Sequence, residues 1–386
     1  MSDNLLIVHG GAPTAVINAS LYGAISEARA AGGARRVYAA VGGTGGILRE
    51  RLKDLSAVSD AELELLPSSP GSAIGTSRDG LKSDDYAAML RVFEKFGIGC
   101  ILMNGGNGTM DTAAKIEAAG RSLGLRVMGI PKTIDNDIAA TDHSPGFGSA
   151  ARFLAGSVAE IIADAASLPI HIVVVESMGR NAGWLTAASA LARDSQGNGP
   201  DLVYVPELDF DEEAYLADAE RLIKSKGFGV VVVSEGIKGK GGKPLVDPIF
   251  QIGRDSYFGD TGAHLANLVI RRLRYKARSE KPGILGRASI PWQSRTDRDE
   301  AVLAGRLACR AVLQGQSGKM VAFRRISTQP YRVEPIFVEL KDVALKERKL
   351  PREYSNAAGN GIAQEYLDWC RPLLGGPLPE AANLLG

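Results

Sequence analysis

The chain has few of the residues from which disulfide frameworks and zinc sites are built. Its 386 residues include only three cysteines, Cys100, Cys309 and Cys370, and four histidines, and no two cysteines form a CxxC pair. Cysteines this few and this widely spaced are typical of reduced thiols in a core. A structural zinc site is not expected either, because such sites need about four cysteine or histidine ligands.

An excess of charge of one sign is also missing, and so are long apolar runs. The formal net charge is +1, so no field of the whole molecule would draw it toward nucleic acid or an acidic membrane surface. The N-terminus has no basic segment, and the run Leu5–Val8 is far too short for a signal peptide or a membrane span. We therefore expect a cytoplasmic protein that binds neither nucleic acid nor membranes.

The common nucleotide-binding signatures are absent from the first glycine-rich turn, His9–Thr14. This turn has neither the GxxxxGK[ST] spacing of a P-loop nor a GxGxxG dinucleotide fingerprint. A dehydrogenase is therefore disfavoured, since the acidic residue that follows such a fingerprint is missing too. The turn can bind phosphate or serve tight packing alone, and a nucleotide, if one binds, is bound in another way.

What the sequence does contain is a regular alternation of short apolar runs with helical patterns. This alternation predicts parallel sheets with helices on both faces, and the length is enough for two such domains. The expected strands are Leu5–Val8, Val37–Val41, Cys100–Met103, Arg126–Ile130, Ile170–Glu176, Leu202–Val205 and Gly229–Ser234, and the expected helices are Ala15–Ala30, Tyr86–Phe96, Asp111–Ala119 and Ala150–Ala166.

Two aspartates directly follow one of these strands, in the heptapeptide Pro131–Asp137 (PKTIDND). The strand Arg126–Ile130 places them at its carboxyl end, where α/β sheets bind their ligands. One carboxylate, of Asp135 or Asp137, can take a proton from a substrate hydroxyl, and the other can help to hold a metal ion.

A second glycine-rich turn, Asn104–Thr109, follows the strand Cys100–Met103. Such a turn between a strand and a helix exposes backbone N–H groups that suit phosphate oxygens. Thr109 can instead serve only as a helix N-cap. Taken with the aspartate pair, the turn predicts phosphoryl transfer to an alcohol.

Two further strand ends carry charged residues. Met178-Gly179-Arg180 follows the strand Ile170–Glu176, which makes Arg180 a candidate anion contact, with a plain surface charge as the alternative. Glu235 follows Gly229–Ser234 and suits hydrogen bonds to sugar hydroxyls.

These motifs together resemble the phosphofructokinase family, and specifically its bacterial pyrophosphate-dependent branch. The similarity extends from Gly10-Gly11 to about Asp297. PKTIDND followed by Met178-Gly179-Arg180 is highly specific for the family. The other matching stretches are Gly105-Gly106-Asn107, Met110-Asp111-Thr112, Thr141-Asp142-His143, Pro145-Gly146-Phe147-Gly148, Asn181-Ala182-Gly183-Trp184 and Arg287.

The resemblance implies a role for each matching residue. Asp135 would be the general base toward the C1 hydroxyl of fructose 6-phosphate, with Lys132 and Arg180 as further catalytic residues, and Asp137 with Asn107 would hold Mg²⁺. Arg278, from a neighbouring subunit, and Arg287 would bind the 6-phosphate. The implied sugar-phosphate contacts are Thr133, Ile134, Asp135, His171, Met178, Gly179, Arg180, Glu235, Arg278, Ile284 and Arg287, and the implied donor contacts are Gly11, Arg78, Gly106, Asn107, Gly108 and Thr109.

Several positions depart from the family pattern. Asn107 replaces an aspartate, so Asp137 and phosphate oxygens would provide more of the Mg²⁺ coordination. Gly108 replaces an aspartate that in the pyrophosphate branch repels the α-phosphate of a nucleotide, so this space is open, as in ATP-using members. Lys132 occurs with both donors. His171 stands where an arginine is expected, and Ile284 where ATP enzymes often carry a histidine, so the 6-phosphate site has lost donors.

The resemblance predicts two doubly wound, Rossmann-like α/β domains with mainly parallel sheets and the active site in the interdomain cleft. Residues 1–147, completed by part of 281–345, would bind the donor phosphates. Residues 148–280, completed by part of 346–386, would bind the sugar phosphate.

The predicted activity is that of a Mg²⁺-dependent 6-phosphofructokinase of glycolysis, with ATP favoured as the donor because of Gly108. The alternatives are pyrophosphate as the donor, another sugar phosphate as the acceptor, and a non-catalytic paralogue that binds a sugar phosphate. A homo-oligomer, either a dimer or a tetramer, is expected.

Overall fold

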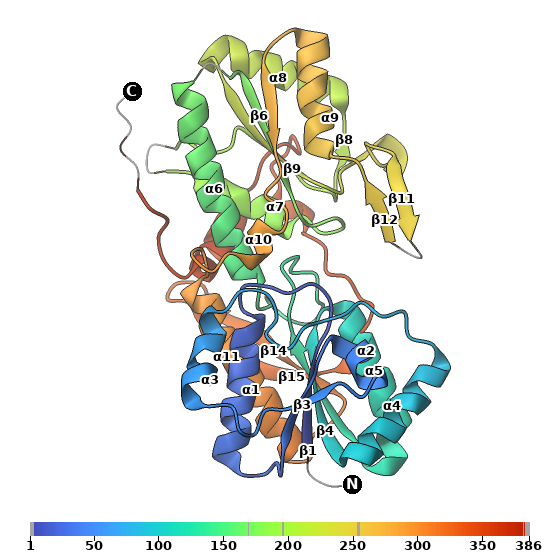
Figure 1. Cartoon of the computed structure of the whole chain (residues 1–386). Coiled ribbons are helices and arrows are strands. Elements are labelled where there is room, and N and C mark those ends of the chain that lie inside the picture. Colours follow the sequence, from blue (N-terminus) through green and yellow to red (C-terminus); the bar gives the residue numbers. More distant parts are fainter. Residues whose placement is uncertain (1–3, 169, 195–196, 253–254, 381, 383–386) are drawn as a thin grey trace. The chain divides into compact units, whose positions relative to one another are not determined.

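The structure is a computed structural model that describes residues 4–168, 170–194, 197–252, 255–380 and 382. The chain folds into two compact units, each built from two separate stretches (Figure 1). Unit 1 consists of Met1–Ser149 and Arg287–Arg348, and unit 2 of Ala150–Gly286 and Lys349–Gly386. The chain passes from one unit to the other within the helix α6 (Phe147–Ser167), within α10 (Leu285–Ala288) and after Arg348.

Unit 1 contains a sheet whose described strands follow the order β15-β14-β5-β4-β1-β2-β3. The neighbours from β14 to β2 are parallel, and the two outermost pairs, β14 with β15 and β2 with β3, are antiparallel. The strands are β1 (Asn4–His9), β2 (Val37–Ala40), β3 (Leu52–Asp54), β4 (Ile98–Gly105), β5 (Arg126–Pro131), β14 (Lys319–Ser327) and β15 (Arg332–Glu339).

Helices cover both faces of this sheet, because its central strands are apolar on both sides. In β1, Leu5 and Ile7 face one core, while Leu6 and Val8 face the other, as the two-residue repeat of a strand requires. Helices α1 and α11 pack on the first face, and α2, α4, α5 and α12 on the second. The helices of unit 1 are α1 (Ile17–Ala31), α2 (Gly43–Leu48), α3 (Asp60–Leu65), α4 (Ser83–Phe96), α5 (Asn107–Gly120), α11 (Arg295–Leu313) and α12 (Leu340–Val343).

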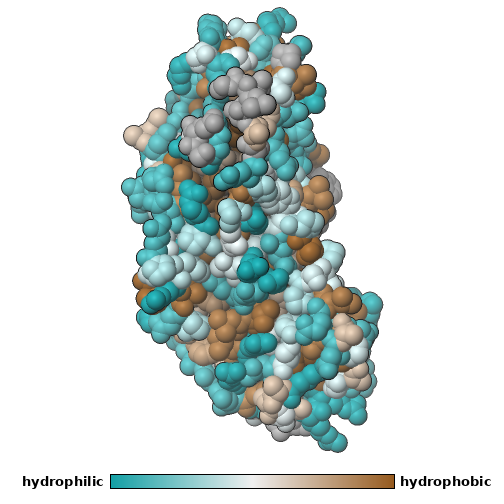
Figure 2. Space-filling view, turned by 90° about the vertical axis from the view of Figure 1, so that its left-hand side faces the viewer, coloured by the Kyte–Doolittle hydropathy of each residue, from teal (hydrophilic) through white to brown (hydrophobic). Residues whose placement is uncertain are grey.

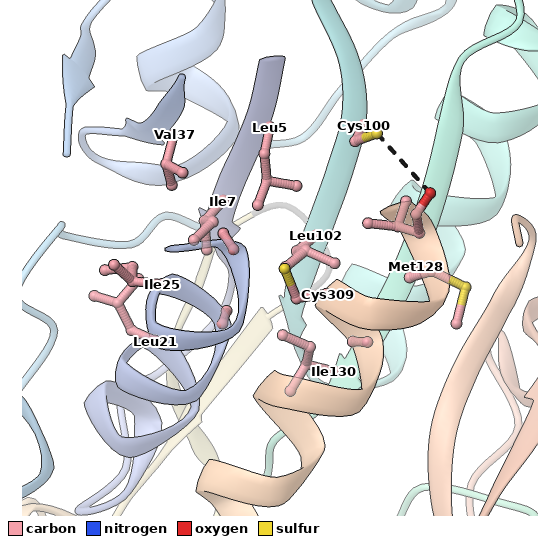
Figure 3. Packing of buried hydrophobic residues seen from close by; sticks show 14 of the residues in the cluster. Leu5, Ile7, Leu21, Ile25, Val37, Cys100, Leu102, Met128, Ile130 and Cys309 are labelled. Atoms are coloured by element: carbon pink, nitrogen blue, oxygen red, sulfur yellow. Dashed lines mark hydrogen bonds between the residues drawn. The ribbon is translucent and has the colours of Figure 1, made fainter. Parts of the chain in front are cut away.

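The first of these cores joins the two stretches of unit 1. In Figure 3, Leu102 from β4 and Ile130 from β5 lie against Cys309 of α11, which belongs to the second stretch. The thiol of Cys100 lies 4.0 Å from the carbonyl oxygen of Val312. All three cysteines are buried, as expected of thiols in a core.

Unit 2 contains a smaller sheet with the order β13-β6-β9-β7, in which all neighbours are parallel. Two short strand pairs, β8 with β10 and β11 with β12, lie outside this sheet. The strands are β6 (Ile172–Ser177), β7 (Leu202–Tyr204), β8 (Asp209–Phe210), β9 (Gly229–Ser234), β10 (Lys238–Gly239), β11 (Pro248–Ile252), β12 (Asp255–Phe258) and β13 (Ala277–Glu280), and the helices are α7 (Trp184–Ala188), α8 (Glu212–Lys226), α9 (Thr261–Leu268) and α13 (Gln364–Cys370).

The surface mixes apolar with polar side chains. Figure 2 shows hydrophobic residues interspersed with hydrophilic ones over the face that it draws, and single exposed apolar side chains such as Ile284 and Leu285 are ordinary for a folded chain. Among the described helices, none is both long enough and apolar enough to cross a membrane. The predicted α/β class with mainly parallel sheets is confirmed.

Candidate phosphoryl-transfer site

The two glycine-rich turns of unit 1 lie side by side at the carboxyl edge of its sheet. Strand β1 leads into Gly10-Gly11, and its neighbour β4 leads into Gly105-Gly106. The N–H of Gly10 donates to the carbonyl oxygen of Asn104 at 2.9 Å. From β1 the chain moves first to β2 on one side and later to β4 on the other, so this is a topological switch point, where open α/β sheets bind ligands.

Thr109 is packed between these turns. A Cβ added at Gly10 would lie 2.3 Å from Thr109 Oγ1, and one added at Gly105 would lie 2.2 Å from the same atom. Both positions therefore require glycine, because no larger residue fits against this side chain. The alternative that Thr109 is an N-cap is wrong: α5 begins at Asn107, and its N-cap is Gly106.

The loop after β5 is fixed to its surroundings at nearly every residue. Lys132 N–H donates to the Gly105 carbonyl at 3.0 Å, and Thr133 N–H donates to the Pro145 carbonyl at 3.1 Å. Asp135 N–H donates to Thr133 Oγ1 at 3.1 Å. Asn136 has a left-handed backbone, with φ of 53°, and its Oδ1 accepts from the N–H of Ser144 at 3.0 Å. The aspartate pair is thus held on a rigid turn rather than on a free loop.

Asp137 and Asn107 form a pair of oxygen-bearing side chains at the start of α5. Asn107 Nδ2 donates to Asp137 Oδ2 at 3.0 Å, and Asn107 Oδ1 is buried with no hydrogen-bond partner among the described residues. Burial raises the pKa of the Asp137 carboxyl group, and the charge of Glu347 raises it further. Mg²⁺ binds oxygen ligands of these two types: a carboxylate that a nearby cation would stabilise, and an amide oxygen that has no hydrogen-bond partner. Among the described residues, no group of three or more histidine, cysteine, aspartate or glutamate side chains could hold a metal ion by itself, so further ligands would have to come from phosphate or water.

Lys132 and Arg287 both interact electrostatically with Asp135, and Arg78 acts on each of these two cations. Lys132 is 4% exposed, and its Nζ donates to the Ala12 carbonyl at 2.6 Å. Burial lowers the pKa of Lys132 to about 8, and Arg78 and Arg287 act in the same direction, whereas Asp135 opposes them.

Arg287 belongs to the same group. Burial and the charge of Arg78 lower its pKa, while Asp135 raises it. Its Nε atom is buried and has no partner among the described residues. Cations that depress one another's pKa values form a site for an anion, because a bound phosphate would relieve their repulsion.

In unit 2 the structure brings together Met178-Gly179-Arg180 and Glu235 at the carboxyl ends of β6 and β9. Glu235 N–H donates to the Ser177 carbonyl at 2.9 Å, and Ser234 Oγ donates to the Gly179 carbonyl at 2.8 Å. Burial raises the pKa of the Glu235 carboxyl group, and Arg180 lowers it.

His171 and Arg278 lie at the opposite end of the same sheet. His171 directly precedes β6, its Nδ1 accepts from the N–H of Lys276 at 3.2 Å, and its ring lies against that of Tyr275. Arg278 is paired in register with Val173, the second residue of β6. The six residues of β6 separate them from Met178 by roughly 20 Å. Ile284 is 64% exposed.

Some residues that hold the site were not anticipated. Asp297 is buried and accepts hydrogen bonds from the N–H groups of Gly146 and Ser149, at 2.8 and 2.9 Å, which fixes the turn after the aspartate loop. In unit 2, Lys281 bridges Glu176 and Asp260 at 2.8 and 2.5 Å. Glu176 stands at a strand end, a signal that could have revealed it, but nothing local in the sequence marks Asp297 or Lys281.

The parallel sheets, the paired glycine turns and the aspartate loop define an α/β phosphotransferase. The sequence profile described as Phosphofructokinase matches residues 4–313, and the chain belongs to the phosphofructokinase family. The family resemblance predicted from PKTIDND and MGR is thereby confirmed.

Three comparisons place the chain within this family. It is 37% identical over 394 residues to the pyrophosphate–fructose 6-phosphate 1-phosphotransferase of Xanthomonas campestris, covering 98% of this chain and 93% of that one. It is 32% identical to a sulfofructose kinase of Alkalicoccus urumqiensis, covering 90% of this chain and 91% of that one. The crystal structure of a pyrophosphate-dependent phosphofructokinase from Marinobacter aquaeolei superposes with a TM-score of 0.88 at 34% identity, covering 99% of this chain and 96% of that one.

Proposed function

We propose that this protein transfers a phosphoryl group from pyrophosphate to the C1 hydroxyl of fructose 6-phosphate. The observation that carries the proposal is the group formed by Asp135 with Lys132, Arg78 and Arg287, which combines a carboxylate base with an anion site. The names of the relatives support pyrophosphate as the donor. They therefore favour the alternative given in the sequence analysis over ATP, the donor that Gly108 had suggested there.

In this mechanism, Asp135 accepts the proton of the C1 hydroxyl as the oxygen attacks the phosphorus atom of the donor. The leaving phosphate departs on the opposite side, in line with the attack. The Lys132 ammonium and the N–H groups of the two glycine turns stabilise the charge that develops on the transferred group. Lys132 remains mostly protonated at pH 7, since its pKa of about 8 is still above that pH.

Asp137 and Asn107 would hold Mg²⁺, which would neutralise charge on the donor phosphates when bound. The orphaned Asn107 Oδ1 and the raised pKa of Asp137 support this assignment. Lacking a formal charge, Asn107 would orient the ion more than attract it.

Unit 1 would bind the donor, and unit 2 would contribute contacts to the acceptor. Met178, Gly179, Arg180 and Glu235 would contact the sugar phosphate in the same chain. His171 and Arg278 lie at the other end of the strand, so they would serve the acceptor site of a second copy in a homo-oligomer.

ATP stays a second candidate because of one observation at Gly108. A Cβ added at this exposed residue would meet no atom within 4 Å, so the start of α5 leaves room for a longer donor. Gly108→Asp should depress any ATP use by sterics and like-charge repulsion and should spare pyrophosphate use.

Steady-state kinetics with pyrophosphate and ATP side by side, with fructose 6-phosphate as acceptor, test the proposal. We expect kcat/KM for pyrophosphate to exceed that for ATP at least tenfold. A preference for ATP would overturn the proposed donor. Phosphate transfer from neither donor would favour another acceptor, such as a sulfofructose, or a non-catalytic protein that binds a sugar phosphate.

A further inference from the structure

A third glycine-rich turn of unit 1 follows strand β2. The segment Val41–Gly46 leads from β2 into the short helix α2. The carboxylate of Asp79 is fastened to this turn: its Oδ2 accepts from Thr44 Oγ1 at 2.6 Å, from Gly45 N–H at 2.6 Å and from Ser77 Oγ at 2.5 Å. Three donors on one oxygen hold this exposed side chain in one place.

The turn is shaped around Asp79 and Ser77. A Cβ added at Gly43 would lie 2.2 Å from Ser77 Oγ and 2.7 Å from its backbone nitrogen. A Cβ added at Gly45 would lie 3.1 Å from Asp79 Oδ1. Partial burial of Asp79 acts to raise its pKa, but the hydrogen bonds from Ser77, Thr44 and Gly45, together with the charge of Arg49, outweigh it and lower that pKa, so the carboxylate is charged at neutral pH.

Ser77 connects this carboxylate to the first glycine turn. The N–H of Gly11 donates to the Ser77 carbonyl at 2.9 Å, and Gly10 and Ser77 form a parallel β-bridge. Asp79 follows Arg78, whose charge acts on both Lys132 and Arg287. A fixed carboxylate, with the guanidinium group of Arg49 near it, therefore stands next to the first glycine turn.

The order of the strands sets the order in which the site residues lie along the carboxyl edge of the sheet. Asp135 follows β5, the two glycine turns follow β4 and β1, and the Asp79 turn follows β2, in the spatial order β5-β4-β1-β2. At about 4.8 Å per strand, β2 lies roughly 14 Å from β5. In the proposed function the transferred phosphoryl group lies near Asp135, so a donor longer than pyrophosphate that follows this edge past the two glycine turns would extend toward β2.

We propose that Asp79 is a donor-specificity residue, whose immobilised carboxylate repels the additional phosphate of a nucleoside triphosphate and so favours pyrophosphate. A like charge placed against the wrong ligand excludes it without weakening the right one. The proposal rests on the proposed function and adds the residue that selects the donor.

Asp79→Asn tests the charge with little change of shape, because the amide oxygen can still accept from Thr44 and Gly45. We expect kcat/KM for ATP to rise at least fivefold relative to that for pyrophosphate, with the pyrophosphate value unchanged within about twofold. Raising the salt concentration should reduce the discrimination against ATP in the wild type but not in the variant.

Two matched variants control for structure. Thr44→Val removes one of the three donors but keeps the charge, so the donor ratio should stay the same. Asp54→Asn removes another carboxylate of unit 1, one that accepts from the N–H of Ser56 at 2.9 Å, and should also leave the ratio unchanged. Urea unfolding of all three variants identifies any that is not folded.

The outcomes separate this inference from the proposed function. If the wild type prefers ATP, the proposed function itself fails. If the wild type prefers pyrophosphate and folded Asp79→Asn has the same donor ratio, or loses both activities equally, the proposed function stands and the role of Asp79 is overturned.

Discussion

At the scale of single residues, Asp135 combines a catalytic position with unusual neighbours. Its backbone N–H donates to Thr133 Oγ1, and its carboxylate lies in the field of Lys132 and Arg287, on both of which Arg78 acts. These cations bind anions, but they do not accept a proton. This setting supports Asp135 in the proposed role of the base that deprotonates an alcohol.

Asp135→Asn should lower kcat about 10²–10⁴-fold and leave acceptor binding nearly intact, because a general base acts in the transition state. Rapid-quench turnover and equilibrium binding of fructose 6-phosphate measure the two quantities. Asp299→Asn, an exposed acid of the same unit, serves as the control. A fall in kcat of less than tenfold would exclude Asp135 as the base.

Arg287→Ala should raise the acceptor KM by about 10- to 100-fold and change kcat far less. A charge-assisted hydrogen bond to a phosphate remote from the reacting atoms contributes about 1.5–3 kcal/mol in the ground and transition states alike. The matched control is Arg298→Ala, which removes a surface arginine paired with Asp299. Unchanged KM values for both substrates would remove Arg287 from the site.

Residue types at strand ends could be predicted from the sequence, whereas contacts across the fold could not. Asp135, Asp137 and Lys132 share one heptapeptide, so their proximity follows from local geometry. Asp79 and Asp297 act on residues far away in the sequence, Gly45 and Gly146, and only tertiary structure brings them there.

At the scale of elements, the segment after the aspartate loop is fastened by a buried network. His143 lies between Asp142 and Glu300, with contacts of 2.8 and 2.6 Å, and Arg325 of β14 donates to Asp142 at 2.9 Å. Tyr331 donates to Glu300 at 2.6 Å. The network ties this segment to α11 and to the β14–β15 hairpin, so it stabilises the turn that carries Asp135.

The stability of wild-type protein should fall between about pH 6.5 and pH 9 through His143. The charges of Asp142 and Glu300 outweigh burial and raise the pKa of His143 from 6.5 to about 9. Because the folded pKa exceeds the unfolded one, the stabilisation is complete below pH 6.5 and is lost as the pH rises through 9. Its size is on the order of 3 kcal/mol.

Urea unfolding of wild type and His143→Gln at several pH values between 6 and 9.5 measures this effect. We expect the difference in unfolding free energy between the two proteins to shrink as the pH rises. His264→Gln is a control, since His264 is a partly exposed histidine paired with Glu212. A difference independent of pH would mean that the pKa of His143 is the same in the folded and the unfolded protein.

Helices and strands with a clear hydrophobic periodicity could be predicted from the sequence. Strands that are defined mainly by their pairing with a neighbouring strand could not. Each expected strand and helix corresponds to an element of the structure, with ends that differ by a few residues, as for Ala150–Ala166 in α6. The β14–β15 hairpin was not predicted. Strand β14 is buried at its start but alternates toward its end, and β15 is partly exposed throughout, so neither carries the apolar run of a central strand.

At the scale of the whole molecule, the proposed homo-oligomer would make activity a property of more than one copy, since Arg278 of one chain would complete the acceptor site of another. Asp135→Asn should be nearly inactive, and Arg278→Ala should be nearly inactive at fructose 6-phosphate concentrations well below its raised KM, which are the concentrations to use in the assay. Refolded together, they should recover roughly a quarter of wild-type activity, because half of random dimers contain one complete site. Activity of the mixture and its mass by light scattering are the measurements. No recovery in verified mixed oligomers would mean that Arg278 serves its own chain or none.

The two-stretch construction of unit 1 has a consequence for how the protein is made. The stretch Arg287–Arg348, which supplies α11 and β14, leaves the ribosome only after all of Ala150–Gly286. Until then, the faces of β4 and β5 that α11 covers, including Leu102 and Ile130, stay bare. Exposed apolar strands are the species that aggregate during folding. A nascent chain halted before Arg295 should therefore be held by chaperones, although the heptapeptide with Asp135 has long since emerged.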